Sequence, residues 1–258
     1  MSKRSYIWSI IIIISILCGF LTIPAYNYYA LPSEQKIYAC QLKSDDTLRI
    51  AMIGDSWVFY HYPYNDTLEK LISQKTGKPV KVSAYGLCGK TSKEIYLSFY
   101  EDQTMQDLLK QGADYCFISV GINDTYKKMG AQYYSRSTAF ILRFLIHNNI
   151  KPILLEIPDY DIKYAYEHQT LDRKLLRQLS MIITRSELDC RQEYRKALIH
   201  ELQLSGIQVS NILLKFPYSP EYYESDRMHL KENGYQVLDS FIADKVQEQA
   251  KIKTKIHF

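Results

Sequence analysis

Beyond residue 46 the sequence alternates between short apolar runs and longer amphipathic stretches. Apolar runs lie at Leu48–Ile53, Val80–Ala84, Tyr115–Val120 and Ile153–Ile157, and a fifth is expected within Ile207–Leu214. Runs of this length without polar alternation are typical of strands that are buried on both faces. We therefore predict five strands of one parallel sheet.

Between these runs, apolar residues recur at helical spacing. Helices are predicted for residues 66–76, 91–110, 131–148, 171–203 with a break near 184–188, and 231–249. The second of these begins at a capping box of Thr91 and Glu94. Strands that alternate with helices form βαβ units, whose helices cover both faces of a parallel sheet. The pattern predicts one three-layer α/β domain over residues 47–258, without internal repeats or an interdomain linker.

The first thirty residues follow a different pattern. Lys3 and Arg4 precede an apolar run, Tyr6–Ile23, that is close to the ~20 residues needed to cross a bilayer core. The region that follows, residues 24–30, lacks small residues at the positions that signal cleavage requires, which favours an uncleaved anchor over a cleaved signal peptide. Lys and Arg residues beside a transmembrane segment usually remain in the cytoplasm, so Lys3 and Arg4 would lie there. We expect a cytoplasmic tip and transmembrane anchor in residues 1–30, a stalk in 31–46, and an extracytoplasmic domain of a bacterial envelope.

Composition and charge change this picture little. The chain is 47% hydrophobic and 23% charged, as in folded domains, which excludes a disordered chain. The net charge of +4 is spread along the sequence without a basic helix face, so nucleic acid is not an expected partner. No metal-ligand spacing is present, and no cofactor is expected. An oxidising compartment would permit disulfides, with the pairing left open, among Cys40, Cys88, Cys116 and Cys190.

Glycine-rich and polar segments follow three of the predicted strands. Gly54–Ser56 follows the first, Gly86–Ser92 the second and Gly121–Asp124 the third, while Asp226–His229 precedes the last helix. In an open α/β sheet, ligands bind beyond the carboxyl ends of the strands. Each segment alone is common in turns and helix caps. Their joint placement indicates a functional site.

In these segments the sequence resembles the SGNH (GDSL-like) hydrolase superfamily. The four blocks of that family match Gly54-Asp55-Ser56, Gly89, Gly121-Ile122-Asn123-Asp124 and Asp226-x-x-His229. They extend over nearly all of the chain beyond the predicted anchor. The resemblance implies a flavodoxin-like parallel sheet and a serine ester hydrolase that uses no cofactor.

The resemblance also assigns roles to individual residues. Ser56 would be the nucleophile, His229 the base that removes its proton, and Asp226 the acid that orients the imidazole ring. A tetrahedral oxyanion needs hydrogen-bond donors already aimed at it. These donors would be the backbone amides of Ser56 and Gly89 and the side-chain amide of Asn123.

The second block departs from the family pattern. An asparagine often precedes its glycine by a few residues, where this chain has Ala84. Gly86 is therefore a rival to Gly89 for the oxyanion hole. Gly89 is preferred because the capped helix that begins near Thr91 places its amide close to a positive helix end. His61 follows the nucleophile in a Tyr-rich stretch and is either a loop histidine or part of the cleft wall.

The expected substrate follows from location and family. An esterase held outside the membrane would meet envelope glycans, so we expect removal of O-acetyl or other short acyl esters from carbohydrate. One alternative is an O-acyltransferase of envelope polysaccharide with the same triad, and another is a non-catalytic glycan-binding protein with this fold. Sequence order leaves the first alternative open, because hydrolase and transferase differ only in how water is kept from the acyl-enzyme.

Overall fold

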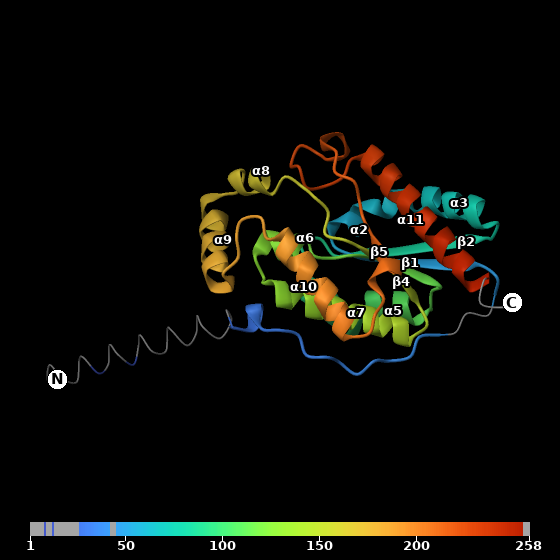
Figure 1. Ribbon diagram of the computed structural model, residues 1–258, viewed down its shortest axis with the longest axis horizontal. Helices are drawn as coiled ribbons and strands as arrows, with labels where there is room; N and C mark the ends of the chain where they lie inside the picture. The colour runs from blue at the N-terminus through green and yellow to red at the C-terminus, as the bar shows by residue number, and fades with distance from the viewer. Residues whose placement is uncertain (1–7, 9–11, 13–25, 42–44, 255–258) are drawn as a thin grey trace.

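A five-stranded parallel sheet forms the centre of the computed structural model, which describes Trp8, Ile12 and residues 26–41 and 45–254 (Figure 1). The strand order is β2-β1-β3-β4-β5, and each adjacent pair is parallel. The strands are β1 (Leu48–Gly54), β2 (Val80–Gly86), β3 (Tyr115–Ser119), β4 (Lys151–Leu155) and β5 (Leu213–Leu214). The predicted α/β class is confirmed, although β5 is shorter than expected.

Helices cover both faces of the sheet (Figure 1). One face carries α4 (Ser92–Glu101), α5 (Gln103–Lys110), α7 (Ala131–His147) and α10 (Arg191–Leu204), and the other carries α2 (Ser56–His61), α3 (Asn65–Thr76) and α11 (Glu232–Thr254). The remaining elements are α6 (Ile122–Lys127), α8 (Ile162–Glu167), α9 (Leu171–Thr184) and the 3-10 turns η1 (Tyr62–Tyr64), η2 (Val209–Asn211) and η3 (Pro220–Tyr222).

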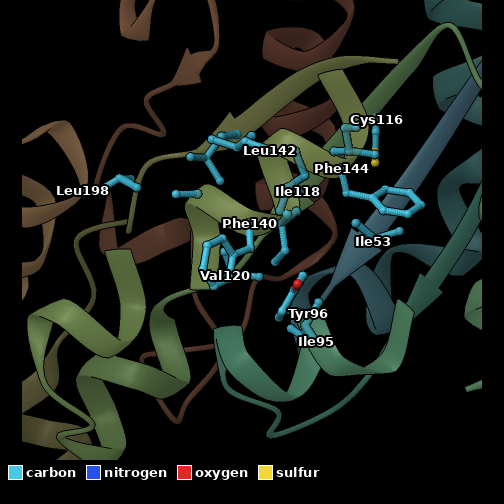
Figure 2. Packing of buried hydrophobic residues seen from close by; sticks show 14 of the residues in the cluster. Ile53, Ile95, Tyr96, Cys116, Ile118, Val120, Phe140, Leu142, Phe144 and Leu198 are labelled. Atoms are coloured by element: carbon cyan, nitrogen blue, oxygen red, sulfur yellow. The ribbon is translucent and has the colours of Figure 1, made fainter. Parts of the chain in front are cut away.

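Two apolar cores lie on opposite sides of the sheet because successive strand residues point to opposite faces. Ile53 and Ile118 belong to the core beneath α7, which Figure 2 shows at close range. Their strand neighbours Met52 and Phe117 belong to the core beneath α3 and α11. Burial on both faces explains why the strands read as continuous apolar runs.

One predicted helix is divided in the structure. The expected helix 91–110 forms as α4 and α5, which meet at Asp102 in an extended conformation. Oδ1 of Asp102 accepts a hydrogen bond of 3.0 Å from the amide of Met105 and so caps α5. The break predicted near 184–188 is confirmed, because α9 ends at Thr184 and α10 begins at Arg191.

The segment predicted as a stalk follows the surface of the domain where it is described. The amide of Gln35 donates to the hydroxyl of Tyr96 at 2.6 Å, and the amide of Cys40 donates to Oδ1 of Asn148 at 2.8 Å. Cys40, Cys88, Cys116 and Cys190 are all free thiols. Among the described residues, no helix has both the length and the apolar character to cross a membrane. The predicted anchor, Tyr6–Ile23, lies outside the described residues except for Trp8 and Ile12.

Candidate active site

The turn between β1 and α2 places Ser56 at the first position of a helix. Asp55 caps that helix, because its Oδ1 accepts a hydrogen bond of 3.1 Å from the amide of Trp57. The same oxygen accepts one of 3.0 Å from the hydroxyl of Ser119, at the end of β3. Asp55 therefore fixes the turn that carries Ser56 and joins it to the end of β3.

The structure brings His229 and Asp226 to this serine from a turn more than 160 residues away. Nε2 of His229 lies 3.0 Å from Oγ of Ser56, and Nδ1 lies 2.5 Å from Oδ2 of Asp226. Oδ1 of Asp226 accepts hydrogen bonds from the amides of Met228 and His229 at 2.9 and 3.0 Å. The indole of Trp57 fixes the turn by donating to the carbonyl of Met228 at 3.0 Å. The three side chains form one hydrogen-bonded chain.

Asp226 is held in its charged form by this turn. Partial burial raises the pKa of its carboxyl, but the hydrogen bonds from the His229 amide, the His229 ring and the Met228 amide outweigh burial. The pKa of Asp226 therefore lies below its ordinary value. A charged carboxylate at Nδ1 favours the tautomer in which Nε2 can accept a proton from Ser56.

The third sequence block divides into two residues with different surroundings. Asn123, on α6, lines the pocket beside Ser56, and its Nδ2 is buried with no hydrogen-bond partner in the described part of the chain. Asp124 is fully buried, and accepts hydrogen bonds from the amide and hydroxyl of Ser92 at 2.9 and 2.5 Å. Burial raises the pKa of Asp124 to about 6, against the effect of these bonds. The amide Nδ2 of Asn123 is thus available to donate a hydrogen bond to a ligand. Asp124 instead joins α6 to the start of α4.

The two candidate glycines of the second block also differ. A Cβ atom on Gly86 would lie 2.1 Å from the amide nitrogen of Phe59, so this glycine lets β2 approach α2. Gly89 has a φ of 72°, lines the pocket, and has open space around a hypothetical Cβ. Nζ of Lys127 donates a hydrogen bond of 2.6 Å to the carbonyl oxygen of Gly89. This placement favours Gly89 as the residue that contacts a ligand.

A pocket of about 450 Å³ opens in front of Ser56 and His229. Much of its wall is contributed by residues that the sequence motifs did not indicate, namely Tyr60, Tyr126, Tyr164, His168, Thr170 and Arg173. The only signal for any of them was the Tyr-rich stretch after the nucleophile, which contains Tyr60. His61, its neighbour, does not line this pocket and is fully buried. Within the described residues, no group of three or more His, Cys, Asp or Glu side chains is placed to hold a metal ion.

Two arginines of α10 contact the ends of the segment that carries α8 and α9. Arg195 donates to the carbonyl of Ile157 and lies 2.7 Å from a carboxylate oxygen of Asp159. Arg191 donates to the carbonyl of Tyr160 at 2.8 Å and to the carboxylate of Asp189 at 2.6 Å. Arg191 therefore joins the start and the end of the segment 159–189.

This arrangement has the parts that acyl transfer requires. The imidazole of His229 is placed to take a proton from Ser56, and Asp226 to stabilise the imidazolium that results. Asn123, with its unpartnered amide, borders the same space from another element. Ser56, His229 and Asn123, which come from three separate segments, thus border one pocket.

Comparison with known proteins supports the same fold. No protein-family model and no curated protein matches the chain in sequence. Solved structures do match: a GDSL-like lipase from Bacteroides thetaiotaomicron has a TM-score of 0.52 and 17% identity, covering 78% of this chain and 88% of its own. A lipase/acylhydrolase from Enterococcus faecalis has a TM-score of 0.53 and 14% identity, covering 78% of this chain and 96% of its own. The domain therefore has the fold of the GDSL-like (SGNH) hydrolases.

Proposed function

We propose that this protein is a serine ester hydrolase that works through an acyl-Ser56 intermediate. The observation that carries the proposal is the hydrogen-bonded chain from Asp226 through His229 to Ser56, which ends at an open pocket. The fold shared with a GDSL-like lipase and a lipase/acylhydrolase supports it. A histidine–aspartate pair alone would not support this proposal, because such pairs also occur in buried cores that have no catalytic role.

The proposed reaction has two halves. Oγ of Ser56 attacks the ester carbonyl while its proton moves to Nε2 of His229, and the alcohol leaves with that proton. Water then loses a proton to Nε2 of His229 and attacks the acyl-enzyme. The bond between the acyl carbon and Oγ of Ser56 breaks, Oγ takes the proton back from His229, and the acid is released. In both halves the amides of Ser56 and Gly89 and the side chain of Asn123 would donate to the oxyanion.

We propose a short acyl ester on a carbohydrate as the substrate, in particular an O-acetyl ester. The aromatic side chains of Tyr60, Tyr126 and Tyr164 line the pocket, and such rings suit the apolar faces of sugars. The proposed location outside the cytoplasm, on the anchor predicted from Tyr6–Ile23, would bring the domain to envelope glycans.

Labelling and product analysis together test this function. The full-length protein is treated with a fluorophosphonate, and with short and long acyl esters in the presence or absence of a carbohydrate acceptor. We expect labelling and ester cleavage in the wild type and neither in Ser56→Ala, while Ser98→Ala, at a buried helical serine, keeps both. Labelling that persists in Ser56→Ala would contradict the assignment of the nucleophile. Acyl groups recovered on the acceptor instead of as free acid would identify an O-acyltransferase.

A further inference from the structure

The helix α9 is amphipathic in the reverse of the usual sense. Its exposed side carries six large apolar residues, here called the α9 face: Leu171, Leu175, Leu176, Leu179, Ile182 and Ile183. Leu171 and Ile182, at opposite ends, are 73% and 74% exposed. A surface helix normally turns such a stripe toward the core.

The polar side of α9 faces the domain instead. Ser180 is buried, and its Oγ lies 2.5 Å from the hydroxyl oxygen of Tyr29, within hydrogen-bond distance. Arg177 stacks over the ring of Tyr126 at 5.1 Å and donates to the carbonyl of Lys127. These contacts fix the rotation of the helix and leave the six apolar side chains of the α9 face exposed. Figure 1 shows α9 at the edge of the domain, close to the segment that begins at residue 26. A contiguous group of large exposed apolar side chains on a folded protein normally marks an interaction site.

The neighbours of the α9 face indicate what covers it. The segment 26–30 contacts α9 through Tyr29 and is joined to α4 by Lys93, whose Nζ donates to the carbonyls of Asn27 and Ala30 at 3.1 and 2.8 Å. In the sequence this segment is separated from the apolar run Tyr6–Ile23 by two residues, and it is rich in tyrosine, a residue that is enriched at membrane–water interfaces. The α9 face therefore lies beside the point where the predicted anchor would enter the membrane.

Charge points to the same occupant. Besides Arg177, which faces the domain, residues 171–185 contain three cations, Arg173, Lys174 and Arg185, against one acid, Asp172. Helices that lie in a membrane interface combine an apolar face with basic residues, which attract anionic lipid headgroups. A second protein copy would gain nothing from a concentration of one sign of charge around the contact.

We propose that the α9 face lies on the lipid surface, as a membrane contact separate from the predicted anchor. If the protein is the ester hydrolase proposed above, this contact also determines which substrates the pocket can reach. Thr170 and Arg173, at the start of α9, line the pocket of Ser56. Docking of α9 would hold the pocket mouth close to the headgroups, within reach of acyl esters on glycans that are still attached to lipid.

Tryptophan fluorescence in vesicles tests the contact without relying on catalysis. The full chain, in a Trp8→Phe background, is reconstituted into vesicles of phosphatidylcholine and phosphatidylglycerol, with or without brominated acyl chains. Trp57 is fully buried and gives a constant signal. We compare Leu179→Trp, on the α9 face, with Leu204→Trp, at a similarly exposed leucine at the end of α10.

The expected result is a blue-shifted emission and a loss of intensity in brominated vesicles for Leu179→Trp, and neither change for Leu204→Trp. Adding Leu175→Glu and Ile182→Glu to Leu179→Trp should abolish both effects. Equal quenching of the two tryptophans by iodide, without bromine quenching, would overturn the proposal. So would protection from iodide without bromine quenching, which would indicate a protein partner or a second copy. A chain that stays off the vesicles would overturn it as well. Because no ester is turned over, failure of lipid contact and failure of the proposed hydrolase are distinguishable.

Discussion

Two histidine–aspartate pairs lie at opposite ends of α2. They consist of the same side chains but differ in burial, in sequence separation and in the groups around them. At the start of the helix, His229 and Asp226 come from one turn and are partly exposed beside Ser56. At its end, His61 pairs with Asp239 of α11, 178 residues away, with side chains that are 0% and 2% exposed. Both nitrogen–oxygen distances are 2.5 Å.

The number of donors around each carboxylate separates the two pairs. Burial raises the pKa of Asp239, and its hydrogen bond to His61 opposes burial without overcoming it. Oδ2 of Asp239 has no hydrogen-bond partner within the described residues. Asp226 has two backbone amides in addition to a histidine, and its pKa is lowered. A short histidine–aspartate contact therefore does not indicate catalysis unless a third reactive group and open space adjoin it.

Replacement of His229 should have the largest effect on activity. In the proposed reaction His229 is the base that takes the proton of Ser56, and we therefore expect His229→Ala to lower kcat by about 10⁴-fold or more. The free energy of unfolding should fall by only about 1 kcal/mol, because the lost hydrogen bonds to Asp226 and Ser56 lie in a partly exposed pocket. Steady-state ester hydrolysis and urea unfolding of the same preparation measure the two quantities.

Replacement of His61 should show the opposite pattern. His61→Ala leaves the buried carboxylate of Asp239 without its partner, which should lower the free energy of unfolding by about 3–5 kcal/mol. At temperatures where the variant is folded, kcat should remain within a few-fold of wild type, since Asp55 fixes the start of α2 independently. A folded His61→Ala protein that is as inactive as His229→Ala would abolish the distinction between the pairs.

Asn123 and Asp124 allow the same contrast to be tested between neighbours. Asn123→Ala removes one oxyanion donor, and kcat should fall by ~10²–10³ with little change in KM. Asp124→Asn should lower kcat much less, and should instead reduce stability by about 1–3 kcal/mol because one of its bonds to Ser92 is impaired. If Asp124 proved essential and Asn123 dispensable, the third block would be misassigned.

The last prediction concerns Asp55 and the pH dependence of stability. Burial raises its pKa to about 7, against hydrogen bonds from Trp57 and Ser119. The folded state therefore holds a proton that an unfolded aspartate, with a pKa near ~3.9, has released, so stability falls as pH rises from about 4 to about 7. The slope should be at most about 1.4 kcal/mol per pH unit.

Asp55→Asn removes the charge and keeps a good helix cap. Thermal unfolding at pH 5 and pH 8 should show a smaller decrease in Tm for this variant than for wild type. Asp66→Asn, at an exposed position of α3, serves as the control and should follow the wild type. An unchanged pH slope in Asp55→Asn would show that Asp55 is ionised in the folded protein throughout this range.

Local pattern predicted the parts of the molecule that depend on local interactions. Apolar runs located four strands closely, and the motif at Asp226–His229 placed a turn before α11. Partners far apart in the sequence carry no such signal: nothing in the stretch around His61 indicates Asp239. Periodicity likewise predicted an amphipathic helix at α9 but not that its apolar side faces outward, because this depends on which residues tie it to the domain. The pocket residues Tyr164 and Arg173 were missed for the same reason.

The arginine contacts at the base of residues 159–189 have an evolutionary consequence. Arg191 and Arg195 hold the two ends of this segment together, so its length can change at little cost: each doubling of a closed loop adds only about 0.6 kcal/mol of entropy. The serine, histidine and asparagine of the site all come from outside it. Insertions, deletions or grafts within residues 160–188 should therefore reshape one side of the pocket and leave the opposite side intact, so that new specificities can arise by exchange of this one segment.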